Sequence, residues 1–381
     1  MLLTTFVLVA ACKSGTDSGA PPDDADAGTS GDDDDTTTPT DPAVAYVGRF
    51  LVDGDRRTVS WPGSRIIARF DGTSVSARIS EQSLYEGPSV FDVKVDDKTT
   101  TLTLQDGEQT YQLGQDLPAG TPQVELFRRT EGQVGLTVFE GFDFGGGKLL
   151  PPPKRRAHRI EILGDSSVTG YGVECPDASG TFSGATENFA KAWGPKVGDL
   201  LDADIIATAY SGKGVIQNFE RSDKVLFPEI FLRTTSESAT PPWDFTKLQV
   251  DVVVIMLGGN DYDLPSNGGP GAPAVADFKK GYADLVATVR EKYPKAFIMN
   301  ALSPLESDDY PPGYQARSNL KKAFTEVTAE RKSAGDSAVG YVEIPQASEA
   351  EQSGCEGHPN VALHERIASV IAPEIKKSKG W

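Results

Sequence analysis

Residues 159–172 read Arg-Ile-Glu-Ile-Leu-Gly-Asp-Ser-Ser-Val-Thr-Gly-Tyr-Gly, and this stretch decides the fold of the second half of the chain. Its apolar run, Ile160 to Leu163, is typical of a strand that is buried on both faces. Gly164-Asp165-Ser166 follows directly and predicts a tight turn that leads toward a helix. Ser166 is therefore expected at the carboxyl end of a strand, where open α/β sheets carry their functional sites.

Alternating strand and helix signals continue from this stretch to the C-terminus. Nearly continuous apolar runs predict further strands at 205–209, 250–257, 297–302 and 339–344. Helices are expected between them, near residues 187–201, 275–292, 314–334 and 361–376. This order predicts that residues 156–381 form a flavodoxin-like, doubly wound parallel sheet with helices on both faces.

Residues 44–155 have a different pattern. Val75, Ala77 and Ile79 alternate with polar residues, and this period of two recurs in short segments separated by turn residues. The pattern predicts an all-β sandwich of antiparallel strands, with Asp71-Gly72 as a hairpin turn. The basic stretch 154–159 then predicts a solvated connection in which His158 is exposed.

The N-terminus predicts export. Leu2 to Ala11 is apolar and leads into Cys12 in a sequence like a bacterial lipoprotein cleavage box, so residues 1–12 are expected to be a signal whose Cys12 is lipidated. Residues 13–43 are rich in Asp, Thr, Gly and Pro and predict a disordered tether. We therefore expect a lipid-anchored protein of the cell envelope or cell surface. The net charge of −18 argues against a nucleic-acid partner.

Three more motifs follow Gly164-Asp165-Ser166 in order: Ser211-Gly212-Lys213-Gly214, Gly258-Gly259-Asn260-Asp261 and Glu356-Gly357-His358-Pro359. Together they supply what ester hydrolysis needs. Ser166 is the expected nucleophile and His358 its base. The N–H groups of Ser166 and Gly212 and the side-chain amide of Asn260 are expected to bind the oxyanion, and neither a metal nor a cofactor is required. Asp165 and Asp261 are expected to hold loops.

These motifs resemble those of the SGNH/GDSL hydrolase superfamily, and a wider set of residues resembles carbohydrate esterase family two. The resemblance implies a jelly-roll sandwich joined to an SGNH domain. It also implies an acetyl xylan esterase-like enzyme that removes acetyl groups, with a preference for the 6-O position, from plant polysaccharides or sugars. The wider set comprises Gly164 to Gly172, Thr186-Glu187-Asn188, Trp243-Asp244-Phe245, the run before Asn260 and Gly380-Trp381.

The chain departs from the superfamily pattern in two places. Cys355 stands where an Asp often precedes the base by three residues, and Glu356 stands two before it. We therefore expect a Ser166–His358 dyad, in which either Glu356 or a backbone carbonyl orients His358. Gly357 occupies a place that is often aromatic in relatives, which predicts a wider sugar site.

Cys175 and Cys355 remain as a pair once Cys12 is assigned to lipidation. In an oxidising compartment they are expected to form a disulfide that holds the His358 loop against the Ser166 loop. A metal site that includes His358, and two buried free thiols, are the alternatives.

Two other functions stay open at this stage. One is an esterase of broader specificity, such as a lipase or thioesterase on the same fold. The other is a non-catalytic surface lipoprotein that binds glycan. The expected partner is an acetylated polysaccharide or oligosaccharide. The membrane is expected to be contacted only through the lipid anchor, and the sequence implies no protein partner.

Overall fold

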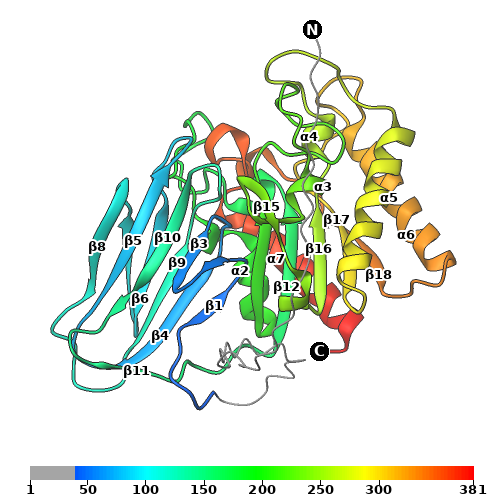
Figure 1. Cartoon of the computed structure of the whole chain (residues 1–381). Coiled ribbons are helices and arrows are strands. Elements are labelled where there is room, and N and C mark those ends of the chain that lie inside the picture. Colours follow the sequence, from blue (N-terminus) through cyan, green and yellow to red (C-terminus); the bar gives the residue numbers. More distant parts are fainter. Residues whose placement is uncertain (1–38) are drawn as a thin grey trace, which may run out of the picture. The chain divides into compact units, whose positions relative to one another are not determined.

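The computed structural model describes residues 39–381, which belong to one compact unit (Figure 1). The expected cleavage box with Cys12, and all but the last residues of the expected tether, lie outside the described residues. Of the helices in the described part, none combines the length and the apolar character needed to cross a membrane.

Two antiparallel sheets form the first part of the described chain, as the period-two pattern predicted. Their inward-facing side chains make a shared apolar core that includes Phe70, Phe91 and Phe139. The first sheet has the order β1 (Ala45–Val47), β4 (Arg65–Asp71), β9 (Gln123–Arg128), β6 (Val90–Val95) and β7 (Lys98–Thr103), with β11 (Lys148–Leu150) also paired to β4. The second has the order β2 (Leu51–Asp53), β3 (Arg56–Val59), β10 (Gly135–Asp143), β5 (Val75–Ser83) and β8 (Gly107–Gly114).

The hairpin predicted at Asp71-Gly72 is wrong. β4 and β5 flank this turn but lie in different sheets, where β4 pairs with β1, β9 and β11 and β5 pairs with β8 and β10. The turn therefore carries the chain from one sheet to the other. Gly72 is tightly packed there, since an added Cβ would lie 3.2 Å from the Phe144 carbonyl oxygen.

A parallel sheet forms the second part, in the order expected for a flavodoxin-like fold. The strands are β13 (Ala203–Ala209), β12 (His158–Gly164), β16 (Val252–Met256), β17 (Phe297–Leu302) and β18 (Val339–Glu343). All four neighbouring pairs are parallel, and β12, β13 and β16 are almost wholly buried. The strands predicted from the apolar runs are confirmed.

Helices cover both faces of this sheet (Figure 1). One core joins the sheet to α2 (Trp193–Leu201) and α7 (Val361–Lys379). A second core joins its other face to α5 (Val275–Lys292) and α6 (Ala316–Ser333). The remaining short elements are α1 (Ser166–Thr169), α3 (Phe227–Ile230), α4 (Gly259–Tyr262), the hairpin of β14 (Arg233–Thr235) and β15 (Ser238–Pro242), and four 3₁₀ turns at Phe189–Lys191, Phe245–Lys247, Glu349–Glu351 and Cys355–Gly357.

The expectation that His158 is exposed in a solvated connection is wrong. His158 is the first residue of β12, and its ring stacks on that of Trp381 at a centroid distance of 3.6 Å. Trp381 is thus packed against the start of β12, at the end of that strand opposite Ser166.

Candidate active site

Ser166 lies where β12 ends and α1 begins. Gly164 must be glycine for this turn, because an added Cβ would lie 2.1 Å from the Val168 Cγ2 atom. Asp165 caps α1, and its Oδ1 atom accepts hydrogen bonds from the Ser167 N–H at 3.0 Å and the Ser167 hydroxyl at 2.8 Å. Asp165 therefore holds the turn, and the Ser166 hydroxyl is left available at the carboxyl end of the sheet.

His358 reaches Ser166 from the loop that precedes α7. Its Nε2 atom is 2.9 Å from the Ser166 Oγ atom. Its Nδ1 atom is 3.0 Å from the Cys355 carbonyl oxygen, which can only accept, so Nδ1 carries the proton and Nε2 is free to act as a base. The Tyr171 ring packs on the imidazole at a centroid distance of 4.2 Å and restrains its rotation.

The Cys355 carbonyl, and not Glu356, is therefore the group that orients His358. The chain turns at Glu356 with a φ of 56°, and this directs the exposed side chain toward Tyr171. There its carboxylate accepts a hydrogen bond from the Tyr171 hydroxyl at 2.8 Å. Of the two orienting groups left open by the sequence, the structure contains the backbone carbonyl, and the Glu356 alternative is wrong.

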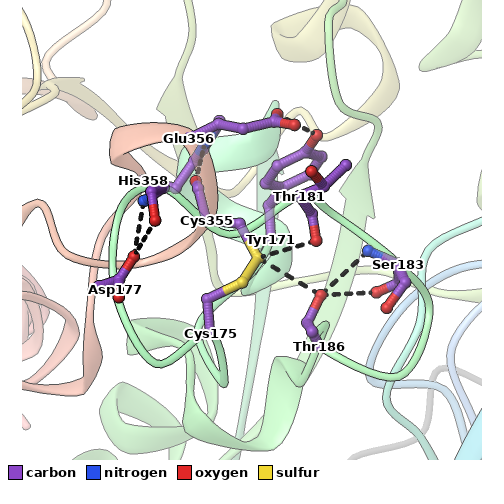
Figure 2. Close-up of a disulfide and its surroundings, with 10 residues drawn as sticks. Tyr171, Cys175, Asp177, Thr181, Ser183, Thr186, Cys355, Glu356 and His358 are labelled. Carbon is purple, nitrogen blue, oxygen red and sulfur yellow. Dashed lines mark hydrogen bonds between the residues drawn. A yellow bond between two sulfur atoms is a disulfide. The ribbon is translucent and has the colours of Figure 1, made fainter.

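A disulfide joins Cys175 to Cys355, with a Cα–Cα distance of 5.2 Å (Figure 2). Backbone hydrogen bonds reinforce the link, because the Cys355 N–H donates to the Gly172 carbonyl at 3.0 Å and the Glu356 N–H donates to the Ala178 carbonyl at 3.0 Å. The loop after Ser166 and the loop before His358 are thus tied together, as predicted. Neither sulfur is a thiolate, so the alternatives of a metal site and of free thiols are excluded.

Gly212 and Asn260 line the same cleft as Ser166. Gly212 follows β13 with a φ of 75°, a conformation that favours glycine. Within residues 39–381, no hydrogen bond occupies the N–H groups of Ser166 or Gly212. The Asn260 Nδ2 atom donates to the Lys213 carbonyl at 3.0 Å and lies 3.2 Å from Asp165 Oδ2. Two backbone N–H groups of the cleft lining are thus without a partner in this range, whereas both N–H donors of the Asn260 amide have one.

Asp261 holds the loop after the second motif, as expected from the sequence. Its buried carboxylate accepts hydrogen bonds from the N–H groups of Val215, Ile216 and Gln217 at 2.8–3.0 Å. Burial raises the pKa of Asp261 to about 7 despite these bonds. The second and third motifs are thereby fixed to one another.

Ser166 and His358 open into a cleft of about 790 Å³. Residues from both parts of the chain line it, with Tyr85 and Gln133 contributed by the sandwich. Acidic side chains are numerous in the lining and include Glu220, Asp263 and Glu306. The lining also contains aromatic rings, among them Tyr85 and Phe219, and this mixture of carboxylates and rings suits a sugar, which has both hydroxyl groups and apolar faces.

Two family models match most of the described chain. The family model for the N-terminal domain of carbohydrate esterase 2 matches residues 46–153, and that of the GDSL-like lipase/acylhydrolase family matches residues 162–366. A family two carbohydrate esterase from Clostridium thermocellum, solved in complex with cellohexaose, is 30% identical with a TM-score of 0.81; the alignment covers 89% of this chain and 100% of that one. The chain belongs to carbohydrate esterase family 2.

The names of two related proteins agree with this family. Cellulase/esterase CelE of Acetivibrio thermocellus is 30% identical over 351 residues, which cover 89% of this chain but only 40% of CelE. An acetylxylan esterase / glucomannan deacetylase of Cellvibrio japonicus is 23% identical, and the match covers 90% of each chain. As a member of this family the chain is a carboxylic ester hydrolase with an SGNH domain.

Sequence reasoning missed several residues around the cleft of this carbohydrate esterase. Tyr171 and Glu187 lie in stretches that carried the family resemblance, but neither was given a role. Burial, with Asp165 and Asp263 nearby, raises the pKa of Glu306 to about 8 in the cleft wall. Glu131 lies in the sandwich, and nothing in its sequence context pointed to the other half of the chain.

The pH dependence of the carbohydrate esterase should reflect His358. Burial lowers the pKa of His358 from 6.5, while the bond to the Cys355 carbonyl and the nearby Glu356 carboxylate oppose this shift. A base works only when neutral, so kcat/KM should be retained below pH 6.5 and fall at a midpoint under that value. The Glu356→Gln substitution removes a negative charge near the imidazole and should move the midpoint lower still. A pH–rate profile on an aryl acetate measures both.

Glu108→Gln is the matched control for this profile, because Glu108 is exposed on β8 in the sandwich. Its profile should coincide with that of the wild type. A wild-type midpoint above 6.5, or one that Glu356→Gln leaves unmoved, contradicts the assignment of the acidic limb to His358.

Proposed function

We propose that this chain is a carbohydrate acetylesterase that removes O-acetyl groups, with a preference for the 6-O position, from plant polysaccharides or oligosaccharides. The observation that carries the proposal is the 2.9 Å contact between His358 Nε2 and Ser166 Oγ at a polar cleft, beside N–H groups free to bind an oxyanion. The names of the relatives support the choice of substrate class.

In the acylation step, Ser166 Oγ attacks the carbonyl carbon of the acetyl ester while His358 Nε2 takes the hydroxyl proton. The negative charge that develops on the carbonyl oxygen is stabilised by the N–H groups of Ser166 and Gly212 and by the Asn260 amide. The Cys355 carbonyl keeps the imidazole in the required tautomer and stabilises the imidazolium that forms. Collapse of the tetrahedral intermediate expels the sugar oxygen, which takes the proton from His358.

In the deacylation step, water replaces the sugar in the cleft. His358 removes a proton from this water while the water oxygen attacks the carbonyl carbon of the acetyl-enzyme. The same donors bind the second oxyanion, and collapse releases acetic acid as the Ser166 oxygen regains its proton from His358; the acid then ionises to acetate in the solvent. The residues described here account for every proton that moves, and the cycle returns the enzyme to its starting state.

The lining of the cleft favours a glycan over a long acyl chain. Long acyl chains need an apolar groove, whereas this cleft has acidic walls that include Glu220, Asp263 and Glu306. Gly357 leaves open space beside the base, since an added Cβ would meet nothing within 4 Å. The openness beside His358 suits a polymer that passes across the site.

The test compares acetate release from acetylated glucomannan and acetylated xylan with hydrolysis of 4-nitrophenyl acetate and octanoate. We expect the full chain to release acetate from glycan and to cleave octanoate with a kcat/KM at least about 100-fold lower than acetate. The Ser166→Ala protein, prepared in parallel, is the blank.

Each alternative gives a different result in this test. Octanoate cleavage without glycan deacetylation would establish an esterase of broad specificity that uses the same dyad. Retention on a glycan matrix with no turnover of any ester would establish a non-catalytic binding protein. Either outcome rejects the proposed function.

We further propose that the protein is exported and anchored by a lipid on Cys12. The lipoprotein-like cleavage box and the Asp-rich segment that follows it motivate this proposal. The Cys175–Cys355 disulfide supports it, because such bonds form and persist in oxidising compartments. Metabolic labelling with a palmitate analogue should label the wild type and not Cys12→Ser.

A further inference from the structure

A carboxylate from the sandwich holds the loop that carries Gly212. Glu131 lies in the turn between β9 and β10 and is completely buried. Its Oε2 atom accepts a hydrogen bond from the Ser211 N–H at 2.7 Å, and its Oε1 atom accepts one from the Ser211 hydroxyl. Both oxygens of one carboxylate thus clamp one residue, and that residue directly precedes Gly212.

The turn that carries Glu131 is itself held rigidly. The guanidinium of the buried Arg128 donates to the carbonyls of Thr130 and Gly135 at 2.8 and 2.6 Å. On the other side, the Glu131 N–H donates to the Glu187 carboxylate at 3.0 Å, and Glu187 belongs to the catalytic part of the chain. The carboxylate of Glu131 is therefore presented to Ser211 from a fixed backbone.

The sandwich turn also fits too closely against the catalytic part to shift. An added Cβ at Gly132 would lie 1.7 Å from the Ser236 Oγ atom. The Gln133 Nε2 atom donates to the Glu131 carboxylate at 3.0 Å. Burial raises the pKa of Glu131, whereas the hydrogen bonds from Ser211 and Gln133 favour its ionised form.

The direction of the Gly212 N–H depends on this clamp. The peptide group between Ser211 and Gly212 rotates with the backbone of Ser211, whose N–H and side chain are both held by Glu131. Beyond the Gly212 carbonyl, which accepts from the Phe219 N–H, the Lys213 carbonyl accepts the hydrogen bond from the Asn260 amide. A displacement of Ser211 would therefore disturb two of the three groups that face the oxyanion.

We propose that Glu131 is a positioning residue for the oxyanion-binding loop 211–213, so that the sandwich completes the active site. This inference rests on the proposed esterase function. Glu131 lies behind the loop and contacts neither Ser166 nor His358 in the described structure, so its effect on turnover passes through Ser211. The sandwich is on this view a part of the catalytic machinery as well as a flanking domain.

The test is Glu131→Gln in the full chain, assayed on 4-nitrophenyl acetate. Glutamine keeps the size but removes the charge and one acceptor oxygen, so the Ser211 hydroxyl loses its carboxylate acceptor and can only accept a weaker bond from the amide nitrogen. We expect kcat to fall by about 10-fold to 100-fold, because small displacements of catalytic groups cost rates of this order, while KM changes less than about twofold. Glu131→Asp keeps the charge but withdraws it by one methylene, and it should lose activity as well.

Asp204→Asn is the matched control. Asp204 is buried at the start of β13 and binds Arg65 of the sandwich at 3.0 Å, so it also links the two parts but at the far end of the sheet. It should lower the melting temperature without lowering kcat at a temperature where the protein is folded. If Asp204→Asn lowers kcat as much as Glu131→Gln does, the effect is structural and the inference is overturned.

A double-mutant cycle with Ser211→Ala identifies the route of the effect. Ser211→Ala removes the hydroxyl bond alone, and combined with Glu131→Gln it should cost less than the product of the single losses, because both act on one contact. Ser211→Ala also tests the inference if the Glu131 variants fail to fold. An unchanged kcat in Ser211→Ala would then contradict the inference. A Glu131→Gln kcat within about twofold of an active wild type overturns the inference alone, whereas an inactive wild type overturns the proposed function.

Discussion

Ser166→Ala should reduce kcat for ester hydrolysis by about 10⁴-fold to 10⁶-fold. The substitution removes the oxygen that forms the acyl-enzyme and leaves the oxyanion donors in place, so a small residual rate over water should remain. The alanine methyl fits the space of the serine side chain, and Asp165 still caps α1 through Ser167. The measurement is kcat on 4-nitrophenyl acetate, with mass spectrometry of the quenched wild type to detect the added acetyl group.

The adjacent serine provides the control. Ser167 is buried, and its hydroxyl donates to Asp165 and does not reach His358. Ser167→Ala should therefore retain kcat within about threefold, since one hydrogen bond to Asp165 is lost away from the reacting atoms while the Ser167 N–H keeps its bond to the same carboxylate. Equal losses from the two substitutions would show that the turn had collapsed and would leave Ser166 without a special role.

Ser166 and His358 should behave as one unit. His358→Ala removes the base and should cost nearly as much as Ser166→Ala, but the double variant should be scarcely slower than either single one. Independent losses that multiply would mean that the two residues act in separate steps. The 2.9 Å contact between Nε2 and Oγ is the reason to expect the first result.

The parallel sheet was predictable because its signals are local. Strands buried on both faces need continuous apolar runs, and these runs end in Gly164 and Gly258, where the chain must turn sharply. Each motif is contiguous in sequence, so Ser166, Gly212, Asn260 and His358 could be named before their distances were known. The fold rule that sites gather at the carboxyl ends of the strands then placed three of them at one edge.

Contacts between distant segments were not predictable in the same way. Asp71-Gly72 has the composition of a hairpin, but composition does not say whether the two strands it joins will pair or lie in opposite sheets. Glu131 reaches Ser211 over a separation of 80 residues, from a turn whose sequence is ordinary for a sandwich. The choice between Glu356 and a carbonyl depended on a backbone rotation at Glu356 itself, which sequence spacing does not reveal.

Removal of the Cys175–Cys355 disulfide should weaken both the fold and the catalytic step. The bond closes a loop with a sequence separation of 180 residues, so the chain-entropy model gives a stabilisation of about 5 kcal/mol relative to the open chain. Cys175→Ser is the preferred variant, because it keeps Cys355 in the sequence. We expect a lower urea midpoint with a steeper slope, because the unfolded chain without the link is more expanded, and the same midpoint for wild type treated with dithiothreitol.

The catalytic effect is expected because the disulfide acts on the residue that orients the base. The Cys355 carbonyl holds His358 Nδ1 at 3.0 Å, and the sulfur of the same residue is the anchor that ties this loop to the Ser166 loop. Without the anchor, hydrogen bonds alone fix the loop, among them those from the Cys355 N–H to the Gly172 carbonyl and from the Glu356 N–H to the Ala178 carbonyl. At a temperature where the variant is fully folded, kcat should fall about 10-fold with little change in KM.

A comparison with the oxidised and reduced wild type separates the two effects. Reoxidation should restore the wild-type kcat, whereas Cys175→Ser should not respond to oxidant. If Cys175→Ser loses stability but keeps its full kcat when folded, the disulfide only closes the loop, and the carbonyl–imidazole bond is self-supporting. If the loss of kcat is fully explained by the fraction of unfolded protein, the disulfide again acts on stability and not on the catalytic step. A loss of kcat in the folded variant requires that the covalent link itself keeps His358 in line with Ser166.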